Sequence, residues 1–398
     1  MARARLLDLT RSLRRADRGA TGVDRVERAY LSHLLSQDTQ LFGLVRTPIG
    51  YLLLDRKGLA AFQERLQGQV PWGRATLLSR LGTGRSAALK RAESDLRRLA
   101  CGRARRGKLS GMFGAWMPDG FDYFNTGHSN LTDRVFDAVK DAGGQAHVLI
   151  HDVIPLSHPE YQRPGTVETF RTKLTRVSAR ADRVIYNSAD TRQQAEAMMQ
   201  QMGRVPPCIV AHLGTIAPCP DASALPDGMP PDVRYFITVG TIEPRKNHAF
   251  LLDIWDEMGP DAPPLLICGA RGWNNAEVFA RLDSVPADGP VKELSGLTDA
   301  ALADLVQNSA GMLFPSHVEG FGLPPLEALT LGTRVLCNDL GVLREFLYEK
   351  PVYASVTDRY LWISTVKSWT NDPETAHKID GFVGPTWAEH FKTVLRLT

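Results

Sequence analysis

The sequence is poor in cysteine and has no pair of cysteines in a CxxC arrangement. Its five cysteines are an odd number and are spread along the chain between positions 101 and 337. A disulfide framework needs paired sulfurs, and a thiolate zinc site needs closely spaced ones. The cysteine pattern therefore argues against a disulfide-stapled secreted domain and indicates a reducing compartment, which predicts a cytoplasmic protein.

Long apolar runs are missing as well. No stretch approaches the roughly 18 uncharged apolar residues of a membrane-spanning helix. The first residues, MARARLLDLTRSLRR, carry charge without an apolar core or a small-residue cleavage site, so no secretory signal is expected. The sequence has no HExxH motif, no Cys/His cluster and no DxD near a strand end, so we expect no metal site and no cofactor.

Acidic residues are scarce in the first third of the chain. Residues 1–110 hold 23 Lys and Arg but nine Asp and Glu, although the formal net charge of the whole chain is only +3. Within this part, residues 72–108 contain eleven basic residues, two acidic residues and a stripe of leucines. Two interpretations stay open: an amphipathic surface that binds anionic lipid at the inner face of the membrane, or a solvated helical insertion.

Strand and helix patterns alternate along most of the 398 residues. Strands are predicted at 5–9, 120–125, 146–151, 183–186, 208–212, 235–240, 265–269, 311–315 and 334–338, and helices at 23–35, 188–201, 247–258, 298–307 and 325–331. Such alternation is typical of an α/β protein with doubly wound sheets. The Pro/Ser/Asp-rich stretch 216–233 reads as a linker. We therefore expect Rossmann-like lobes at 1–215 and 234–380, facing across a cleft, and a last helix within 381–398 that crosses back to the first lobe.

One predicted strand leads to two adjacent cations. In YFITVGTIEPRKN the strand ends at Gly240, and Thr241, Arg245 and Lys246 follow in the loop. Cations at such a position stabilise a phosphate leaving group, because its negative charge grows in the transition state. Taken alone, the pair is better explained as a solvated Arg-Lys pair in a turn.

A second predicted strand runs into a glycine turn and a helix opened by prolines, LFPSHVEGFGLPPLEAL. Prolines at a helix start leave the N–H groups of Phe321, Gly322 and Leu323 free to bind a phosphate. Glu319 and Glu327 are eight positions apart, so both can point at one ligand, the first at sugar hydroxyls and the second at a ribose diol. The alternative for Glu327 is a first-turn acid that complements the helix dipole.

The segments GTIEPRKN and EGFGLPPLEAL together resemble glycosyltransferase family four, whose members are retaining enzymes of the GT-B fold. The segments TGVDRVE, HDVIPLSHPEY and YNSADTR are similar to bacterial mannosyl- and rhamnosyltransferases of surface polysaccharide assembly. The resemblance implies that Arg245 and Lys246 contact the donor diphosphate, Glu319 the sugar and Glu327 the ribose. It also implies GDP-mannose as the donor, and a saccharide or lipid-linked saccharide as the acceptor. One position departs from the family: Thr241 stands where many members have an arginine, so Arg245 would supply that cation.

Candidates in the first lobe lie where its strands end. His151 and Asp152 lie where the strand predicted at 146–151 ends, at the edge of an open α/β sheet that faces the ligand crevice. In the family a histidine here lies beside the transferred sugar, so we expect His151 to orient that sugar. The alternative is a His-Asp pair that only caps the strand. Gly22, His128 and Asn187 are further candidates for acceptor or cleft contacts.

Two other functions fit parts of the sequence. A sugar-nucleotide epimerase or hydrolase would use the same fold and the same donor motifs. A non-enzymatic nucleic-acid-binding protein would use the basic residues 72–108, but it would leave Glu319 and Glu327 without a role. No nucleic-acid partner is therefore expected.

Overall fold

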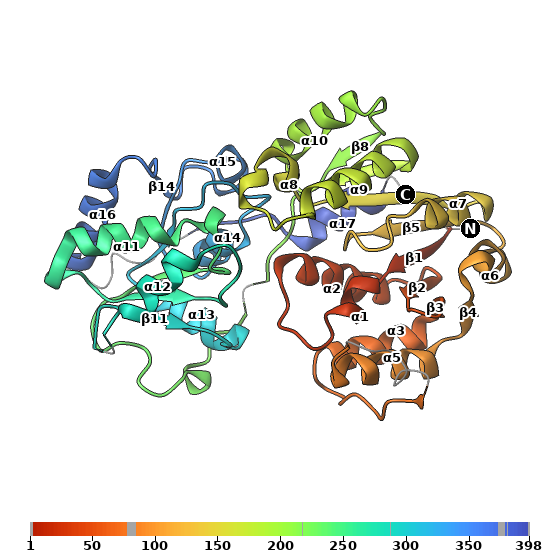
Figure 1. The fold of residues 1–398 in the computed structure, drawn as a ribbon, viewed down its shortest axis with the longest axis horizontal. Coiled ribbons are helices and arrows are strands. Elements are labelled where there is room, and N and C mark those ends of the chain that lie inside the picture. The colour runs from red at the N-terminus through yellow and green to blue at the C-terminus, as the bar shows by residue number, and fades with distance from the viewer. Residues whose placement is uncertain are drawn as a thin grey trace.

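The computed structural model describes residues 3–77, 85–216, 218–286, 288–372, 379 and 381–396. Two lobes are each built on a sheet of their own (Figure 1). Within the described residues, no helix combines the length and the apolar character needed to cross a membrane.

The N-terminal lobe contains an eight-stranded sheet in the order β4-β3-β2-β1-β5-β6-β7-β8. Its strands are β1 Ala4–Asp8, β2 Leu41–Arg46, β3 Tyr51–Leu54, β4 Gly102–Ala104, β5 Phe121–Asn125, β6 Gln145–Ile150, β7 Arg183–Tyr186 and β8 Cys208–Val210. Its helices are α1 Thr10–Arg14, α2 Gly22–Leu35, α3 Arg56–Leu66, α5 Ala87–Leu99, α6 Leu109–Trp116, α7 Asp133–Asp141, α8 Ile154–Ser157, α9 Thr166–Arg180 and α10 Ala189–Gln201. The pairs β2–β3 and β3–β4 are antiparallel. The sequence had not predicted these three edge strands.

The C-terminal lobe contains a six-stranded parallel sheet in the order β11-β10-β9-β12-β13-β14. Its strands are β9 Phe236–Val239, β10 Leu265–Cys268, β11 Val291–Leu294, β12 Gly311–Phe314, β13 Val335–Cys337 and β14 Val352–Tyr353. Its helices are α11 His248–Met258, α12 Ala276–Ser284, α13 Asp299–Gln307, α14 Leu323–Thr330, α15 Gly341–Leu347 and α16 Arg359–Asn371. This is the strand order of a Rossmann sheet, and it reverses between β9 and β12, the point where such sheets bind ligands. The predicted α/β class with doubly wound lobes is confirmed.

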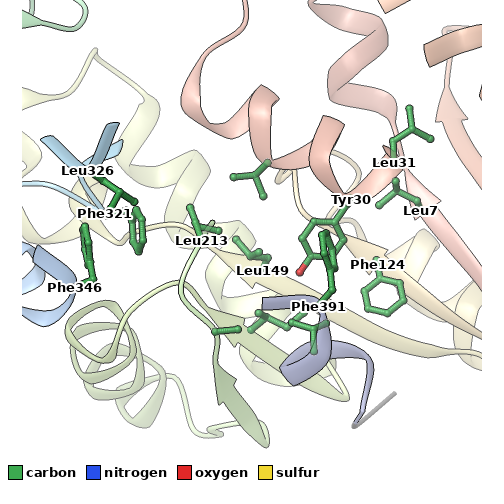
Figure 2. Close-up of a cluster of buried hydrophobic side chains, with 14 of the residues drawn as sticks. Leu7, Tyr30, Leu31, Phe124, Leu149, Leu213, Phe321, Leu326, Phe346 and Phe391 are labelled. Atoms are coloured by element: carbon green, nitrogen blue, oxygen red, sulfur yellow. The ribbon is translucent and has the colours of Figure 1, made fainter. Parts of the chain in front are cut away.

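One apolar cluster runs from the first lobe into the second. Figure 2 shows Tyr30 and Leu149 of the N-terminal lobe, Leu213 after β8, and the stacked rings of Phe321 and Phe346 in the C-terminal lobe. Burial of apolar surface stabilises the contact between the lobes in the same way as it stabilises each core. The two lobes are therefore in direct apolar contact with each other.

The last described helix, α17 Trp387–Leu395, packs on the N-terminal lobe (Figure 1). The ring of Phe391 stacks on His33 of α2, with 3.8 Å between centroids and an interplanar angle of 5°. His390 Nε2 lies 2.8 Å from the hydroxyl of Tyr30. The chain thus returns across the cleft and ties its C-terminal part to α2.

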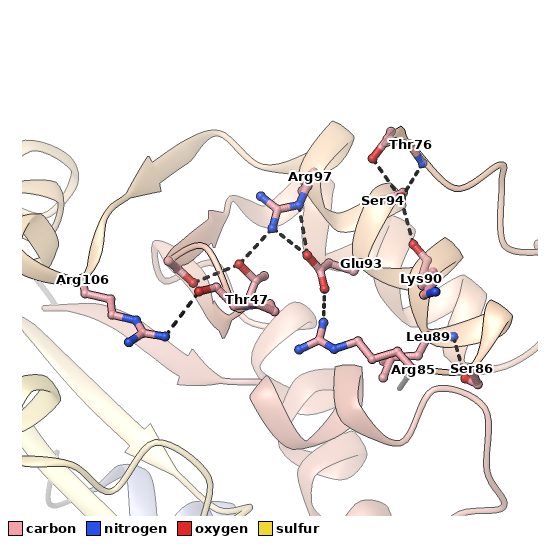
Figure 3. Close-up of polar contacts among 12 residues, drawn as sticks. Thr47, Thr76, Arg85, Ser86, Leu89, Lys90, Glu93, Ser94, Arg97 and Arg106 are labelled. Carbon is pink, nitrogen blue, oxygen red and sulfur yellow. Dashed lines mark hydrogen bonds and ion pairs between the residues drawn. The ribbon is translucent and has the colours of Figure 1, made fainter. Parts of the chain in front are cut away.

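The basic segment 72–108 folds as part of the N-terminal lobe (Figure 3). Helix α5 packs on α3, and Leu96 is fully buried, whereas Leu77 is exposed. Glu93 pairs with both Arg85 and Arg97. Most described leucines of this stripe face the core rather than solvent; those at 78 and 81 lie outside the described residues. Binding of the segment to anionic lipid stays a prediction, without a continuous apolar face among the described residues to support it.

Candidate functional site

The loop after β9 brings two cations to the switch point of the C-terminal sheet. Gly240 has a φ of 149°, and a Cβ atom built on it would lie 3.2 Å from Cε of Lys246. The glycine therefore leaves room for the lysine side chain to fold back over the strand end. Lys246 is 8% exposed, and Arg245 precedes it in a single 3₁₀ turn.

Glu319, in the loop after β12, binds both of these cations. Its Oε1 lies 2.6 Å from Nζ of Lys246, and its Oε2 lies 2.8 Å from a guanidinium nitrogen of Arg245. The guanidinium also contacts Glu243 at 2.6 Å. Burial by itself would raise the pKa of Glu319, but Arg245 and then Lys246 hold it at about 2. The carboxyl group of Glu319 is therefore ionised at neutral pH. It holds Arg245 and Lys246, the two residues predicted to bind phosphate, in place.

The turn before α14 leaves backbone donors free. Gly322 adopts a left-handed conformation with a φ of 104°, and the helix begins at Leu323. Within the described residues, the N–H groups of Phe321, Gly322 and Leu323 donate to no backbone or side-chain acceptor. Their position at a helix N-terminus suits an anion. The Phe321 side chain itself is a core residue stacked on Phe346 at 4.1 Å.

Glu327 is held from the opposite lobe. Its Oε1 lies 2.6 Å from a guanidinium nitrogen of Arg25 in α2 and 3.4 Å from the hydroxyl of Thr215. Burial raises the pKa of Glu327, and Arg25 acts against that rise. Arg25 and Glu327 also line an interlobe cavity of about 270 Å³, together with Leu323. Glu319 and Glu327 are thus each bound to cations in this structure, and the sequence had not singled out Arg25.

Two neutral histidines lie at the strand ends of the N-terminal lobe. His151 Nε2 is 2.6 Å from the carbonyl oxygen of Thr126, and His128 Nε2 is 2.7 Å from that of Leu149. Burial lowers the pKa of His151 to about 4 and that of His128 to about 3. A carbonyl can only accept, so Nε2 of His151 carries the proton and its Nδ1 stays an acceptor.

The candidate residues of the two lobes meet at Gly320. Its carbonyl oxygen accepts hydrogen bonds from Asn187 Nδ2 at 3.1 Å and from Thr191 Oγ1 at 3.2 Å. A Cβ atom built on Gly320 would lie 2.6 Å from the carbonyl oxygen of His151 and 2.7 Å from Cβ of Asp152. This close approach sets His151 and Asp152 directly against the loop that carries Glu319.

Gly22 approaches the same helix start from α2. It is the first residue of α2, and a Cβ atom built on it would lie 3.4 Å from Cδ1 of Leu323. Thr21 and Asp24 form a capping box there, and Asp24 also binds Arg11 and Arg15 at 2.6 Å each. Asp24 was not singled out in the sequence, although the spacing of Thr21 and Asp24 carries the signal of a capping box.

A further contact between the lobes was not predicted from the sequence. Glu345 of α15 accepts from the N–H groups of Ala189 and Asp190 at the start of α10, and lies 2.6 Å from His212 Nε2. Nothing in the local sequence links positions 156 residues apart. Within the described ranges, no group of three or more His, Cys, Asp or Glu is arranged to hold a metal ion.

Known proteins resemble this chain in the sequence of its C-terminal lobe and in its overall fold. Residues 226–380 match the family described as glycosyl transferases group 1. The serotype-specific mannosyltransferase WbdA of Escherichia coli is 32% identical over 238 residues, which cover 55% of this chain and 29% of WbdA. The O-antigen chain mannosyltransferase B of Escherichia coli is 31% identical over 127 residues, 31% of this chain and 33% of that protein. This chain thus spans about a third or less of the length of these relatives.

The solved structure of Anabaena HepE in complex with UDP-glucose has a similar fold. It superposes with a TM-score of 0.60 at 15% identity and covers 93% of this chain and 90% of HepE. At that identity the likeness concerns the fold. The chain therefore has the GT-B fold and resembles bacterial mannosyltransferases, and its C-terminal lobe matches the glycosyl transferases group 1.

Proposed function

We propose that the chain transfers a hexosyl group from a nucleoside diphosphate sugar to a hydroxyl group of a saccharide acceptor, with retention of the anomeric configuration. The observation that carries the proposal is the arrangement of Arg245 and Lys246 around the ionised Glu319, beside the open amides of residues 321–323. Two cations and a helix N-terminus suit a diphosphate, and the carboxylate suits sugar hydroxyls.

The reaction needs no protein nucleophile. The acceptor oxygen forms a bond to the anomeric carbon on the face from which the diphosphate departs, and the bond from that carbon to the phosphate oxygen breaks. The acceptor hydroxyl proton passes to the departing phosphate oxygen. Arg245 and Lys246 stabilise the charge that develops on the diphosphate. Neutral His151 orients the sugar and accepts a hydrogen bond at Nδ1.

The proposed donor and acceptor rest on the relatives, and the proposed independence of a metal ion rests on the charge of the site. We propose GDP-mannose as the donor and a growing surface polysaccharide, free or lipid-linked, as the acceptor, because the matched Escherichia coli proteins are named mannosyltransferases. The reaction would occur on the cytoplasmic side of the membrane. We propose no metal requirement, since two positive side chains already face the expected diphosphate position.

A donor screen tests the proposal. Thermal shifts with GDP-, UDP- and dTDP-sugars, each with a chelator, identify the nucleotide, because a ligand that binds the native state raises the melting temperature. Product analysis with and without an acceptor then separates transfer from epimerisation and hydrolysis. A new α-linked glycoside from an α-linked donor supports the proposal, whereas only free sugar or an epimer would overturn it.

A further inference from the structure

Glu27 of α2 is a buried acid to which the proposed transfer reaction gives no role. It is 1% exposed, and its Oε1 accepts hydrogen bonds from the backbone N–H of Ser12 at 2.8 Å and from the Ser12 hydroxyl at 2.5 Å. Among the described residues no donor reaches Oε2, although this atom is also shielded from solvent. A carboxylate ionised in this place would leave one buried oxygen unpaired, so the arrangement fits a protonated carboxyl group.

The unpaired oxygen lies against the turn that follows β5. A Cβ atom built on Gly127 would lie 2.2 Å from Oε2 of Glu27 and 2.9 Å from Cβ of Arg11. These two neighbours occupy the place of a side chain at position 127. The backbone of Gly127 therefore rests directly on the carboxyl group of Glu27.

The same turn sets the two histidines at the strand ends. The carbonyl oxygen of Thr126 accepts the hydrogen bond from His151 Nε2 at 2.6 Å, and His128 follows Gly127. His128 has a φ of 52°, a left-handed conformation that residues with a side chain adopt rarely. The Thr126 carbonyl group and Cα of Gly127 belong to one planar peptide unit. A shift of Gly127 would therefore move the carbonyl group that orients the ring of His151.

The groups around Glu27 favour its protonated form at neutral pH. Burial raises the pKa of Glu27 to about 8, and the nearby carboxyl group of Asp8 in β1 adds to the rise. The hydrogen bonds from Ser12 and the charge of Arg11, both in α1, act against it. Arg11 is itself paired with Asp24 at 2.6 Å. The two neighbouring histidines are neutral in this range, because burial lowers their pKa. Glu27 thus loses its proton only in mild alkali.

We propose that protonated Glu27 is a positioning residue of the transfer reaction: it holds the turn at Gly127, and through it the ring of His151, in the orientation that meets the sugar. This inference rests on the proposed function and adds a residue to it. When Glu27 loses its proton, the charge on Oε2 is buried without a donor, so the carboxylate or the turn must move. The Thr126 carbonyl group then leaves its place, and His151 loses the hydrogen bond that orients its ring.

The pH profile of turnover tests this role. We compare kcat at saturating substrates from pH 6.5 to 9.5 in wild type and in Glu27→Gln, whose amide has the shape of a protonated carboxyl group and does not titrate. Between pH 7 and pH 9 we expect kcat of wild type to fall about tenfold, as for a group with a pKa of about 8. The ratio of the two rates in Glu27→Gln should stay close to one. Glu64→Gln, at an exposed position of α3, is the matched control and should keep the wild-type fall.

A second variant shifts the profile without changing Glu27. The hydrogen bond from the Ser12 hydroxyl favours the ionised carboxylate, so its loss in Ser12→Ala raises the pKa of Glu27 further. We expect the alkaline fall of kcat to move to higher pH in Ser12→Ala, and this expectation holds even where Glu27→Gln folds poorly. An alkaline fall at the wild-type pH in both variants would overturn the inference.

Nitrogen-15 NMR of histidine-labelled protein separates the inference from the transfer reaction, because it needs no substrate. The His151 signal, assigned by its loss in His151→Gln, reports the hydrogen bonding of the ring nitrogens. We expect it to shift as the pH passes 8 in wild type and to stay fixed in Glu27→Gln. A His151 signal that stays fixed in wild type up to pH 9.5 would contradict the inference. A signal that shifts as expected, without sugar transfer from any donor, would overturn the proposed function and leave the coupling of Glu27 to His151 standing.

Discussion

Arg25 of α2 and Glu327 of α14 form an ion pair of 2.6 Å that joins the two lobes at the proposed ribose site. The carboxylate expected to bind a ribose diol is therefore already engaged by the opposite lobe. A donor must displace Arg25 or share the carboxylate with it. The pair consequently couples donor binding to the contact between the lobes.

The first prediction separates the two partners of this pair. Glu327→Gln should raise the donor Kd by about 10- to 100-fold, because a hydrogen bond to a charged group contributes about 1.5–3 kcal/mol. Arg25→Gln should instead lower the Kd, because a competitor for the carboxylate is gone. Calorimetric titration measures both. Exposed Glu277→Gln in α12 is the control, and equal Kd values for wild type and Glu327→Gln would contradict the ribose assignment.

The second prediction concerns the fork of Arg245. Arg245→Lys keeps the charge but cannot bridge Glu243 and Glu319 as the guanidinium does. We expect kcat to fall in Arg245→Lys and to fall further, by about 10²- to 10³-fold, in Arg245→Gln. Steady-state kinetics at saturating donor measure the loss. Arg281→Lys, at a half-exposed ion pair with Asp253, should leave kcat unchanged; a similar loss there would point to a general effect on folding.

The third prediction is a loss of stability in mild acid. Burial lowers the pKa of His151, His248 and His390 to about 4 and that of His128 to about 3. Their ordinary value is 6.5, so between pH 6.5 and 4 the unfolded chain binds more protons than the folded one. The free energy of unfolding therefore falls as the pH falls through this window. The fall is about 1.4 kcal/mol per pH unit for each histidine whose pKa is lower in the folded than in the unfolded chain.

Melting temperatures measured from pH 7.5 to 4.5 check this sign. His390→Gln should flatten the slope, because its ring no longer has to stay neutral beside Tyr30. A melting temperature that rises on acidification over this range would show that the buried rings are not the dominant groups.

The donor motifs could be predicted from the sequence because their signals are local. The strand and the glycine that ends it indicated that Lys246 lies in the loop after β9. The prolines after Gly322 indicated the start of α14 within a few residues. These features depend on backbone geometry over a few residues. The contacts of Glu319 with Arg245 and Lys246 were not foreseen as a carboxylate–cation network, because the two loops are more than 70 residues apart.

The remaining features depend on contacts between distant segments. Strands β2, β3 and β4 form an antiparallel edge whose partners are set by the sheet, and short apolar runs do not specify that pairing. The leucine stripe of 72–108 was compatible with a lipid-facing surface, because helical spacing alone does not specify which part of the protein packs against an apolar helix face. Leu96 instead packs into the core beneath α3. Arg25 gave no signal, because its partner Glu327 lies in the other lobe.

The fourth prediction tests the return of α17 to the first lobe. Phe391 is 2% exposed and contacts His33, Tyr30 and Trp387. Phe391→Ala should destabilise the protein by about 3–5 kcal/mol, because truncation of a buried phenylalanine removes apolar contacts and leaves a cavity. Denaturant unfolding measures the change, and Lys392→Ala, next to it and exposed, is the control. Unchanged stability in Phe391→Ala would mean that the helix does not hold the lobe in solution.

The fifth prediction uses the close approach at Gly320. An alanine Cβ would lie 2.6 Å from the His151 carbonyl oxygen, which is shorter than atoms tolerate without movement, and the neighbour is backbone. Gly320→Ala should therefore push the lobes apart, break the hydrogen bonds from Asn187 and Thr191, and lower kcat. Small-angle scattering should give a larger radius of gyration. Gly341→Ala is the matched control, because its Cβ would meet nothing closer than 3.7 Å, at Asp190. If Gly320→Ala kept both the wild-type radius and the wild-type kcat, the methyl group would be accommodated without separating the lobes, and the prediction would be wrong.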